Sequence, residues 1–237
     1  MPLLDLINKP EDLKGIKISQ LPDLADEIRQ IIISTISKTG GHLASSLGVV
    51  ELTIALLRTF NLNKDKIIWD VGHQCYAHKI LTGRKEQFQT IRQYLGLSGF
   101  PKICECDYDC FGTGHASTSI SAALGMAKAR DIKGENFKVI AVIGDGSLTG
   151  GMSFEALNHA GHTKTDMIVI LNDNEMSISP TVGGLLQHID NFRTNATYNK
   201  FRKDVSDIVS MFGKQATKMV KKIDETVKAL IVDNMLF

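Results

Sequence analysis

Two polar turns, each directly after a run of apolar residues, constrain the fold of this chain more than any other feature. Gly144-Asp145-Gly146 follows residues 138–143 (KVIAVI), and Asn172-Asp173-Asn174 follows residues 167–171 (MIVIL). Both runs are typical of buried parallel strands. Residues 150–161 between them (GGMSFEALNHAG) carry apolar side chains at helical spacing and end at glycine. The pattern predicts a βαβ unit with two neighbouring parallel strands and a helix packed over them.

The two turns also place oxygen ligands at one edge of the predicted sheet. Asp145 and Asn174 both follow the C-terminal ends of strands, where open α/β sheets bind ligands. A carboxylate beside an amide oxygen suits Mg²⁺, which keeps positions for phosphate oxygens. Gly144 and Gly146 let the backbone approach an anion, and the next helix offers N–H groups. A metal and phosphate site is predicted; the alternative is an ordinary strand-loop-helix in which Asp145 caps the helix.

Composition limits the other functions that the chain can have. Its 237 residues can bury a full core and predict one large domain. The 27 basic and 26 acidic residues nearly balance, so nothing indicates binding to nucleic acid or to an anionic membrane. No apolar run approaches the roughly 20 residues of a membrane span. The N-terminal sequence MPLLDLINKPEDL resembles neither a signal nor a transit peptide, so a cytoplasmic location is expected.

Helical and strand patterns alternate along the chain without internal repeats. Such alternation predicts a three-layer α/β/α fold with a mostly parallel sheet. Besides the βαβ unit, the elements expected are helices over residues 21–37, 47–60, 77–82 and 117–132, a strand over 66–71, loops over 84–108 and 175–186, and an amphipathic helix within 214–237. The loop over residues 84–108 is expected to cover the site.

The four cysteines do not form a recognisable metal or disulfide pattern. Cys104, Cys106 and Cys110 lie in one acidic stretch, and Cys75 stands apart. Disulfides are rare in cytosolic enzymes, and a zinc site commonly needs four ligands in paired knuckles. Free thiols in a surface loop are therefore expected, with a weak metal site as the alternative.

Three histidines share one local arrangement. His42, His73 and His115 each directly follow a glycine, on a predicted turn between two regular elements. Turns of this kind display catalytic groups, and histidine exchanges protons near neutral pH. Three such turns beside a metal and phosphate site favour function over simple packing. The other four histidines are expected to be structural or surface residues: His78, His159, His162 and His188.

The two polar turns and their flanking sequence resemble the thiamine diphosphate enzymes of the transketolase superfamily, and among them the 1-deoxy-D-xylulose-5-phosphate synthase family. The matching stretches are residues 40–51 (GGHLASSLGVVE), 68–84 (IWDVGHQCYAHKILTGR), 112–121 (GTGHASTSIS) and 142–179, which include NDNEMSIS. A generic transketolase would not be expected to share the WDVGHQ or NDNEMSIS motif. The resemblance runs from about residue 21 to residue 186 and weakens after that.

The resemblance implies which residues would hold the metal and the diphosphate. Asp145, the side-chain oxygen of Asn174 and the backbone carbonyl of Met176 would coordinate Mg²⁺. Two diphosphate oxygens and a water would complete the octahedron. Gly146 and Ser147 would bind the diphosphate through backbone N–H groups.

The resemblance also assigns roles to the three histidine turns. His73 and the turn Gly114-His115-Ala116 would contact thiamine diphosphate, and His42, His115 and His73 would serve catalysis, with His42 and His115 facing the substrates and handling protons. The family usually has serine where Ala116 stands. That change matters little if the contact is made through the backbone, but a side-chain hydrogen bond would be lost.

The implied reaction is the condensation of pyruvate with D-glyceraldehyde 3-phosphate, which releases CO₂ and gives 1-deoxy-D-xylulose 5-phosphate. This product is a precursor for isoprenoids and thiamine. The cofactor carries the chemistry and the protein provides orientation and proton transfer. In this family a pyrimidine-binding domain and a C-terminal domain follow the diphosphate-binding domain, which here occupies residues 1–237 and looks truncated. The isolated chain is therefore expected to have negligible synthase activity.

Four possibilities remain open for the whole molecule. The chain is a fragment of a synthase that forms a homodimer, or a second polypeptide carries the pyrimidine-binding domain. It could also be the N-terminal subunit of a split transketolase-like enzyme, although the WDVGHQ wording argues against this. A non-catalytic cofactor-binding or assembly module is the alternative from a different functional class.

Overall fold

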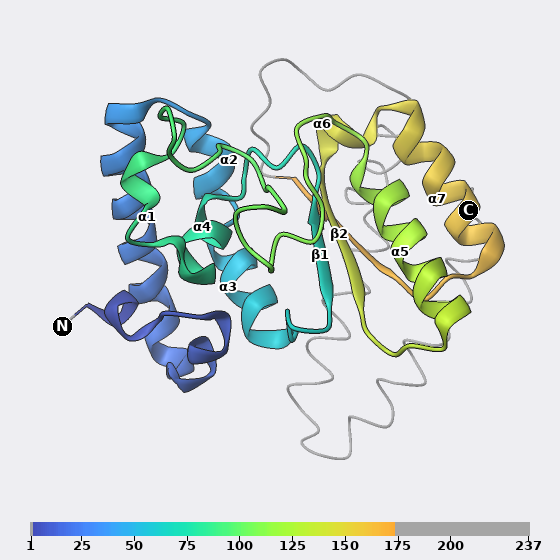
Figure 1. Ribbon diagram of the computed structural model, residues 1–237, viewed down its shortest axis with the longest axis horizontal. Coiled ribbons are helices and arrows are strands. Elements are labelled where there is room, and N and C mark those ends of the chain that lie inside the picture. Colours follow the sequence, from blue (N-terminus) through green and yellow to red (C-terminus); the bar gives the residue numbers. More distant parts are fainter. Residues whose placement is uncertain (1, 174–237) are drawn as a thin grey trace, which may run out of the picture. The chain divides into compact units, whose positions relative to one another are not determined.

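The computed structural model describes residues 2–173, which lie within one compact unit (Figure 1). The sheet of this part of the chain has the order β1-β2-β3, and both strand pairs are parallel. Its strands are β1 (Lys66–Trp69), β2 (Val139–Gly144) and β3 (Ile168–Asn172). The predicted parallel sheet is confirmed.

One face of the sheet continues the main hydrophobic core. The register aligns Ile67, Ile140 and Ile168 in one row across the three strands, and Trp69, Val142 and Ile170 in the next. Because side chains alternate between faces along a strand, both rows point to the same side. All six residues belong to, or pack against, one buried cluster.

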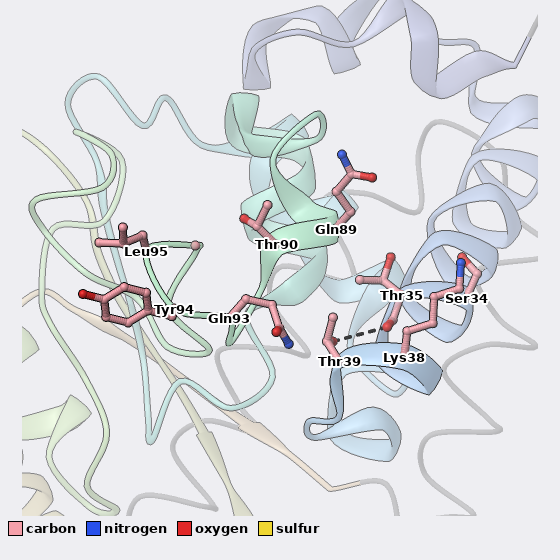
Figure 2. A pocket seen from close by; sticks show the side chains of 10 residues that line it. Ser34, Thr35, Lys38, Thr39, Gln89, Thr90, Gln93, Tyr94 and Leu95 are labelled. Atoms are coloured by element: carbon pink, nitrogen blue, oxygen red, sulfur yellow. Dashed lines mark hydrogen bonds between the residues drawn. The ribbon is translucent and has the colours of Figure 1, made fainter.

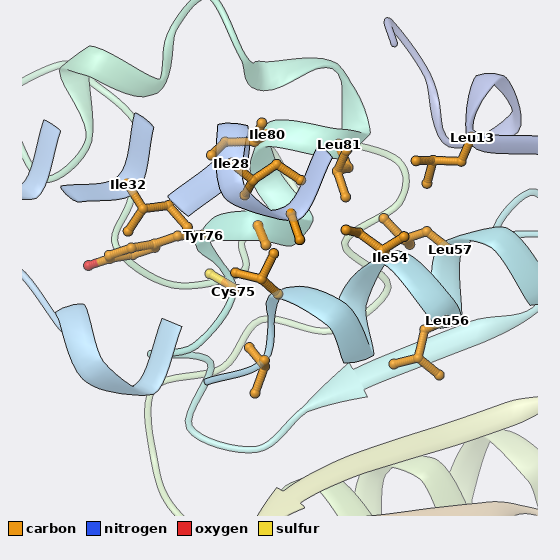
Figure 3. Close-up of a cluster of buried hydrophobic side chains, with 14 of the residues drawn as sticks. Leu13, Ile28, Ile32, Ile54, Leu56, Leu57, Cys75, Tyr76, Ile80 and Leu81 are labelled. Carbon is orange, nitrogen blue, oxygen red and sulfur yellow. The ribbon is translucent and has the colours of Figure 1, made fainter. Parts of the chain in front are cut away.

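Helices on this face complete the core (Figure 3). They are α1 (Leu21–Thr39), α2 (Leu43–Leu47), α3 (Val50–Thr59) and α4 (Tyr76–Lys79). In α1 the buried residues Leu24, Ile28, Ile32 and Ile36 recur every four positions, so they form one apolar stripe. Fully burying one such side chain contributes about 1.5–3 kcal/mol, which makes this stripe the main reason that α1 docks.

The opposite face of the sheet is covered by α5 (Ser119–Lys133) and α7 (Gly151–Thr163), as Figure 1 shows. α5 packs against both β2 and α7. Its small residues Ala123 and Ala127 are fully buried, which allows close approach to the sheet. With helices on both faces, the predicted three-layer α/β/α fold is confirmed.

The elements of the βαβ unit also follow one another in the expected order. β2 leads into the short helix α6 (Asp145–Leu148), then α7, and then β3, which pairs in parallel with β2. The glycine turn at 144–146 therefore lies at the C-terminal end of a central strand. No described helix has both the length and the apolar character that crossing a membrane requires.

Two predicted helices differ from the structure. The helix expected over residues 47–60 begins only at Val50, because α2 ends at Leu47 and Gly48 caps it. The helix expected over 77–82 is α4, which starts at Tyr76 and passes into a wider turn, Ile80–Arg84. That turn contains Gly83 at a φ of +87°, a left-handed conformation that ends regular helix.

The N-terminal residues form three short 3-10 turns that the sequence pattern did not predict. These are Leu3–Leu6, Pro10–Gly15 and Ile18–Gln20. Arg58 on α3 holds the end of the second turn by donating hydrogen bonds to the backbone carbonyls of Leu13 and Ile16, the latter at 2.7 Å, and Glu27 accepts from the N–H groups of Leu3 and Leu4 in the first. The loop predicted over residues 175–186 and the helix predicted within 214–237 lie outside the described residues.

Candidate functional site

The C-terminal ends of the three strands bring the predicted site segments to one edge of the sheet. β1 leads into Asp70 and the turn with His73, and β2 leads into Asp145. Gly144 is in register with Asn172, the last residue of β3. Asn174 and Met176, the other two predicted Mg²⁺ ligands, lie outside the described residues.

A buried carboxylate organises this edge. Asp70 is 1% exposed, and its Oδ1 and Oδ2 accept hydrogen bonds from the backbone N–H groups of Ser117 at 2.8 Å and Ser119 at 2.9 Å. These bonds hold the turn before α5, which includes His115, against the end of β1. Ser117 has a φ of +69°, an unfavourable conformation for a non-glycine residue. Charge-assisted hydrogen bonds to Asp70 offset that cost.

Ser117 in turn fixes the glycine turn after β2. Its Oγ donates to the backbone carbonyl of Ser147 at 2.6 Å. A Cβ placed at Gly150 would lie 2.0 Å from the same Oγ, so only glycine fits there without movement. Asp70, Ser117 and Ser147 thus connect the ends of β1 and β2 with the turn before α5.

The structure brings two of the three predicted histidines together. The ring centroids of His42 and His73 are 5.4 Å apart, in an edge-on arrangement. Ser46 on α2 donates to the carbonyl of His73 at 3.1 Å, and the hydroxyl of Tyr76 accepts from the N–H of His42 at 3.3 Å. The His73 turn is therefore held by Ser46, which follows His42 in the chain, and the His42 turn is held by Tyr76, which follows His73.

The surroundings of both histidines favour the neutral imidazole. Burial, assisted by the charge of Arg92, lowers the pKa of His42 below its ordinary value. Burial and the neighbouring His42 lower the pKa of His73, and Asp70 opposes this effect. His73 Nδ1 is buried without a hydrogen-bond partner among the described residues, so it is available to a bound group. A neutral imidazole in this setting can accept a proton.

His115 lies apart from this pair. Gly114, His115 and Ala116 are exposed on the turn that Asp70 holds. Within residues 2–173, no ring contact joins His115 to His42 or His73. Gly146 is also exposed, and Asp145 and Ser147 are half-buried.

Residues 98–113 form a covering segment, from which Phe100, Pro101 and Thr113 pack against the His42 and His73 turns. The loop predicted over residues 84–108 overlaps this segment, but it also contains the 3-10 turn Phe88–Thr90. Phe100 packs against His42, with ring centroids 5.9 Å apart. Gly72 has a φ of +85°, and a Cβ there would lie 2.3 Å from Pro101 Cδ and 2.1 Å from Thr113 Oγ1. This close packing requires glycine immediately before His73.

A set of mostly buried titratable side chains links this segment to α4 and the turn after it, and sequence reasoning did not find it. Its members are His78, Lys79, Arg84, Glu105 and Asp109. The signal available in the sequence was the presence of basic residues in an otherwise apolar helix, together with an acidic stretch shortly after it. His78, expected to be structural or a surface residue, is 1% exposed.

The four cysteines are free thiols, as predicted. Burial raises the pKa of the Cys75 thiol to about 12 and that of Cys110 to about 11, which makes both poor nucleophiles at neutral pH. The expectation that all lie in a surface loop is only partly met, since Cys75 is fully buried.

An open pocket of about 630 Å³ lies next to the site between α1 and the segment after Phe88–Thr90 (Figure 2). Its walls include Thr35 and Thr39 from the last turns of α1, and Thr39 Oγ1 donates to the carbonyl of Thr35 at 3.2 Å. None of the predicted site residues lines this pocket.

Comparison with known proteins identifies the family. The family model described as 1-deoxy-D-xylulose-5-phosphate synthase matches residues 4–237. The chain belongs to this family.

Curated 1-deoxy-D-xylulose-5-phosphate synthases are similar over nearly the whole chain. That of Caldanaerobacter subterraneus subsp. tengcongensis is 55% identical over 99% of this chain. Those of Natranaerobius thermophilus and Alkaliphilus oremlandii are each 57% identical, over 99% and 98% of this chain. The chain spans 38% of the length of each of these synthases. The similarity therefore concerns the N-terminal portion of the family, and the edge of the sheet described above belongs to that portion.

Proposed function

We propose that this chain supplies the Mg²⁺ and diphosphate half of the site of a thiamine diphosphate-dependent synthase. The reaction is the condensation of pyruvate with D-glyceraldehyde 3-phosphate to 1-deoxy-D-xylulose 5-phosphate and CO₂. The observation that carries the proposal is the connection from Asp70 through Ser117 to Ser147, because it holds the glycine turn and the histidine turns at one sheet edge. Membership of the synthase family supports the choice of reaction.

The residues present suit a metal-bound diphosphate. Asp145 provides a carboxylate at the end of β2, and Asn174 would complete the pair of oxygen ligands with the carbonyl of Met176. The first-turn N–H groups of a helix lack partners within it, which suits Gly146 and Ser147 to phosphate oxygens. A Cβ placed at Gly146 meets nothing within 4 Å, so the backbone there is open to a ligand.

The histidine turns suit the organic part of the cofactor and the substrates. Thiamine diphosphate, when bound, supplies the electron sink for carbon–carbon bond cleavage and formation. His73, with its unpartnered Nδ1, and the Gly114-His115-Ala116 turn would contact it. His42, more exposed than His73, would face the substrates and exchange protons with them, and His115 would assist. An alanine at position 116 leaves only a backbone contact there.

The remaining partners follow from the same proposal. We expect a homodimer, or a complex with a second chain that carries the pyrimidine-binding domain, in the cytoplasm. A polypeptide of these 237 residues alone is expected to release no measurable CO₂ from pyruvate in the presence of D-glyceraldehyde 3-phosphate.

Calorimetry with thiamine diphosphate and Mg²⁺ tests the binding proposal. We expect binding that requires Mg²⁺ and that weakens at least about tenfold in Asp145→Ala, since a charged metal ligand is lost. Asp166→Ala is the matched control, because Asp166 is an exposed aspartate paired with Lys138 at 2.9 Å. Absence of binding, or equal affinity in Asp145→Ala and Asp166→Ala, contradicts the proposal.

A further inference from the structure

Asp109, which lies in the segment that covers the His42 and His73 turns, anchors that segment to the α4 region. Arg84 donates to both carboxylate oxygens, at 2.6 Å and 2.9 Å, and His78 Nε2 lies 3.1 Å from Oδ1. The backbone N–H of Lys102 also donates to Oδ2 at 2.9 Å. Asp109 therefore joins the start of the covering segment to the turn after α4.

A second carboxylate repeats this arrangement. Glu105 accepts from Lys79 Nζ at 2.5 Å and from the backbone N–H of Ser98 at 2.6 Å. Lys79 is fully buried, and Glu105 is its ion-pair partner. Residues 98 and 102 are thus each fixed by a carboxylate that is itself held by a buried cation of the α4 region.

The charge states in this network follow from its hydrogen bonds. Although burial opposes ionisation, hydrogen bonds from His78 and Arg84 hold the pKa of Asp109 well below its usual range. Burial lowers the pKa of His78, and the bond to Asp109 opposes this only in part. A carboxylate only accepts, so neutral His78 carries its proton on Nε2. Within the network, Asp109 thus pairs with one cation, Arg84, and accepts from one neutral donor, His78.

A network of this kind is a costly way to stabilise a core. Removing two charges from water costs several kcal/mol per ion, and apolar side chains of the same volume often serve stability equally well. What apolar contacts lack is direction, whereas the two-pronged Arg84–Asp109 contact fixes both distance and angle. The geometry therefore favours a role in placing the covering segment.

We infer that Arg84, Asp109 and His78 are positioning residues that hold Phe100 and Pro101 over the His42 and His73 turns. The two contacts that carry this are Phe100 with His42, at 5.9 Å between ring centroids, and Pro101 with Gly72. The network touches neither histidine directly and acts through the covering segment. The relevance of the network to cofactor binding rests on the proposed function. The contact between Phe100 and His42 does not depend on that proposal.

Histidine NMR titration without any cofactor tests this inference directly. Phe100 contributes to the burial that lowers the pKa of His42. In Asp109→Asn and in Arg84→Lys we expect the pKa of His42, assigned with His42→Gln, to rise toward its ordinary value. Phe100→Ala removes the contact itself and is expected to produce the same rise. Arg58→Lys is the matched control, because it loosens an arginine tether of the N-terminal turns and not of the covering segment.

The affinity for thiamine diphosphate with Mg²⁺ is the second measurement. We expect it to weaken about tenfold in Asp109→Asn and Arg84→Lys, as is usual when residues behind a binding site are changed, and to stay unchanged in Arg58→Lys. Arg84→Lys keeps the charge and serves the same test if Asp109→Asn does not fold.

Loss of thermal stability with an unchanged His42 pKa would mean that the network is merely structural, and would overturn the inference. A His42 shift in a protein that binds no thiamine diphosphate would support the positioning role and contradict the proposed function. The two failures are therefore distinguishable.

Discussion

Two buried aspartates lie under the same edge of the sheet and are neutralised in different ways. Asp70 accepts hydrogen bonds from backbone N–H groups of Ser117 and Ser119, whereas Asp109 faces the guanidinium of Arg84. Backbone donors move only with the chain that carries them, so Asp70 fixes a turn. Asp109 is held by the side chains of Arg84 and His78 and by one backbone N–H, that of Lys102, and its counter-charge comes from a side chain that a mutation can remove. The hydrogen bonds of Asp70 tie chain segments together. The Arg84–Asp109 pair, by contrast, leaves an unfavourable buried charge if either residue is removed.

Removing the partner should show this difference most strongly. Asp109→Leu removes the nearer carboxylate from buried Arg84 and leaves only Glu105, at 3.6 Å and already paired with Lys79, so we expect the free energy of unfolding to fall by about 3–5 kcal/mol. The double variant Asp109→Leu with Arg84→Met should recover most of that loss, because Arg84 no longer leaves a buried guanidinium without the Asp109 carboxylate, while the Lys79–Glu105 pair stays intact. Urea unfolding followed by circular dichroism measures both. Equal stability of the single and the double variant would contradict this account of Asp109.

Asp70→Asn should lower the free energy of unfolding by less than Asp109→Leu does. The amide keeps one acceptor for Ser117 or Ser119 and leaves no unpaired cation, so we expect a loss of about 1–3 kcal/mol in the same unfolding experiment. Affinity for thiamine diphosphate with Mg²⁺ should also fall, since the turn before α5 is less firmly held. A loss as large as that of Asp109→Leu would show that the two aspartates do not differ as proposed.

Gly150→Ala probes the contact that Asp70 supports. The added Cβ would lie 2.0 Å from Ser117 Oγ, and we expect a cost of about 1–3 kcal/mol from the resulting displacement. Ser117→Gly in the same chain should restore much of the stability, because it removes both the clashing hydroxyl and the unfavourable φ of +69°. Gly151→Ala is the matched control, since a Cβ there meets nothing within 4 Å. Thermal unfolding of the four proteins distinguishes these effects.

The smallest expected effect concerns pH. The folded-state pKa of His78 is lowered by burial, so below about pH 6.5, the ordinary pKa of histidine, the unfolded chain binds a proton that the folded chain does not. Stability should therefore fall as the pH drops from 7 to 5. His78→Gln should flatten this dependence in urea unfolding series, and an unchanged slope would assign it to other groups.

The sequence was sufficient for the parts of the molecule that depend on local pattern. The strands on both sides of α7, the glycine turn after β2 and the helical stripe of α1 could all be predicted from side-chain periodicity. The 3-10 turns at the N-terminus could not, because the side chains that hold the first two, Glu27 and Arg58, are distant in sequence.

The site shows the same division. His42 and His73 could be selected because glycine precedes each, but only the structure shows their rings 5.4 Å apart. Asp70 and Asp109 carried no signal of their own: their partners lie 47 and 25 residues away, and burial decides their role. Long-range pairing of charges leaves no local periodicity from which it could be inferred.

The position of Trp69 has a practical consequence. It is the single tryptophan of the chain, it ends β1 immediately before Asp70, and its ring contacts His78 edge-on at 6.0 Å. The fluorescence of an indole responds to changes in the polarity of its surroundings. The fluorescence of the unlabelled protein thus reports on the junction between the carboxylate that holds the ligand turn and the charges that hold the covering segment.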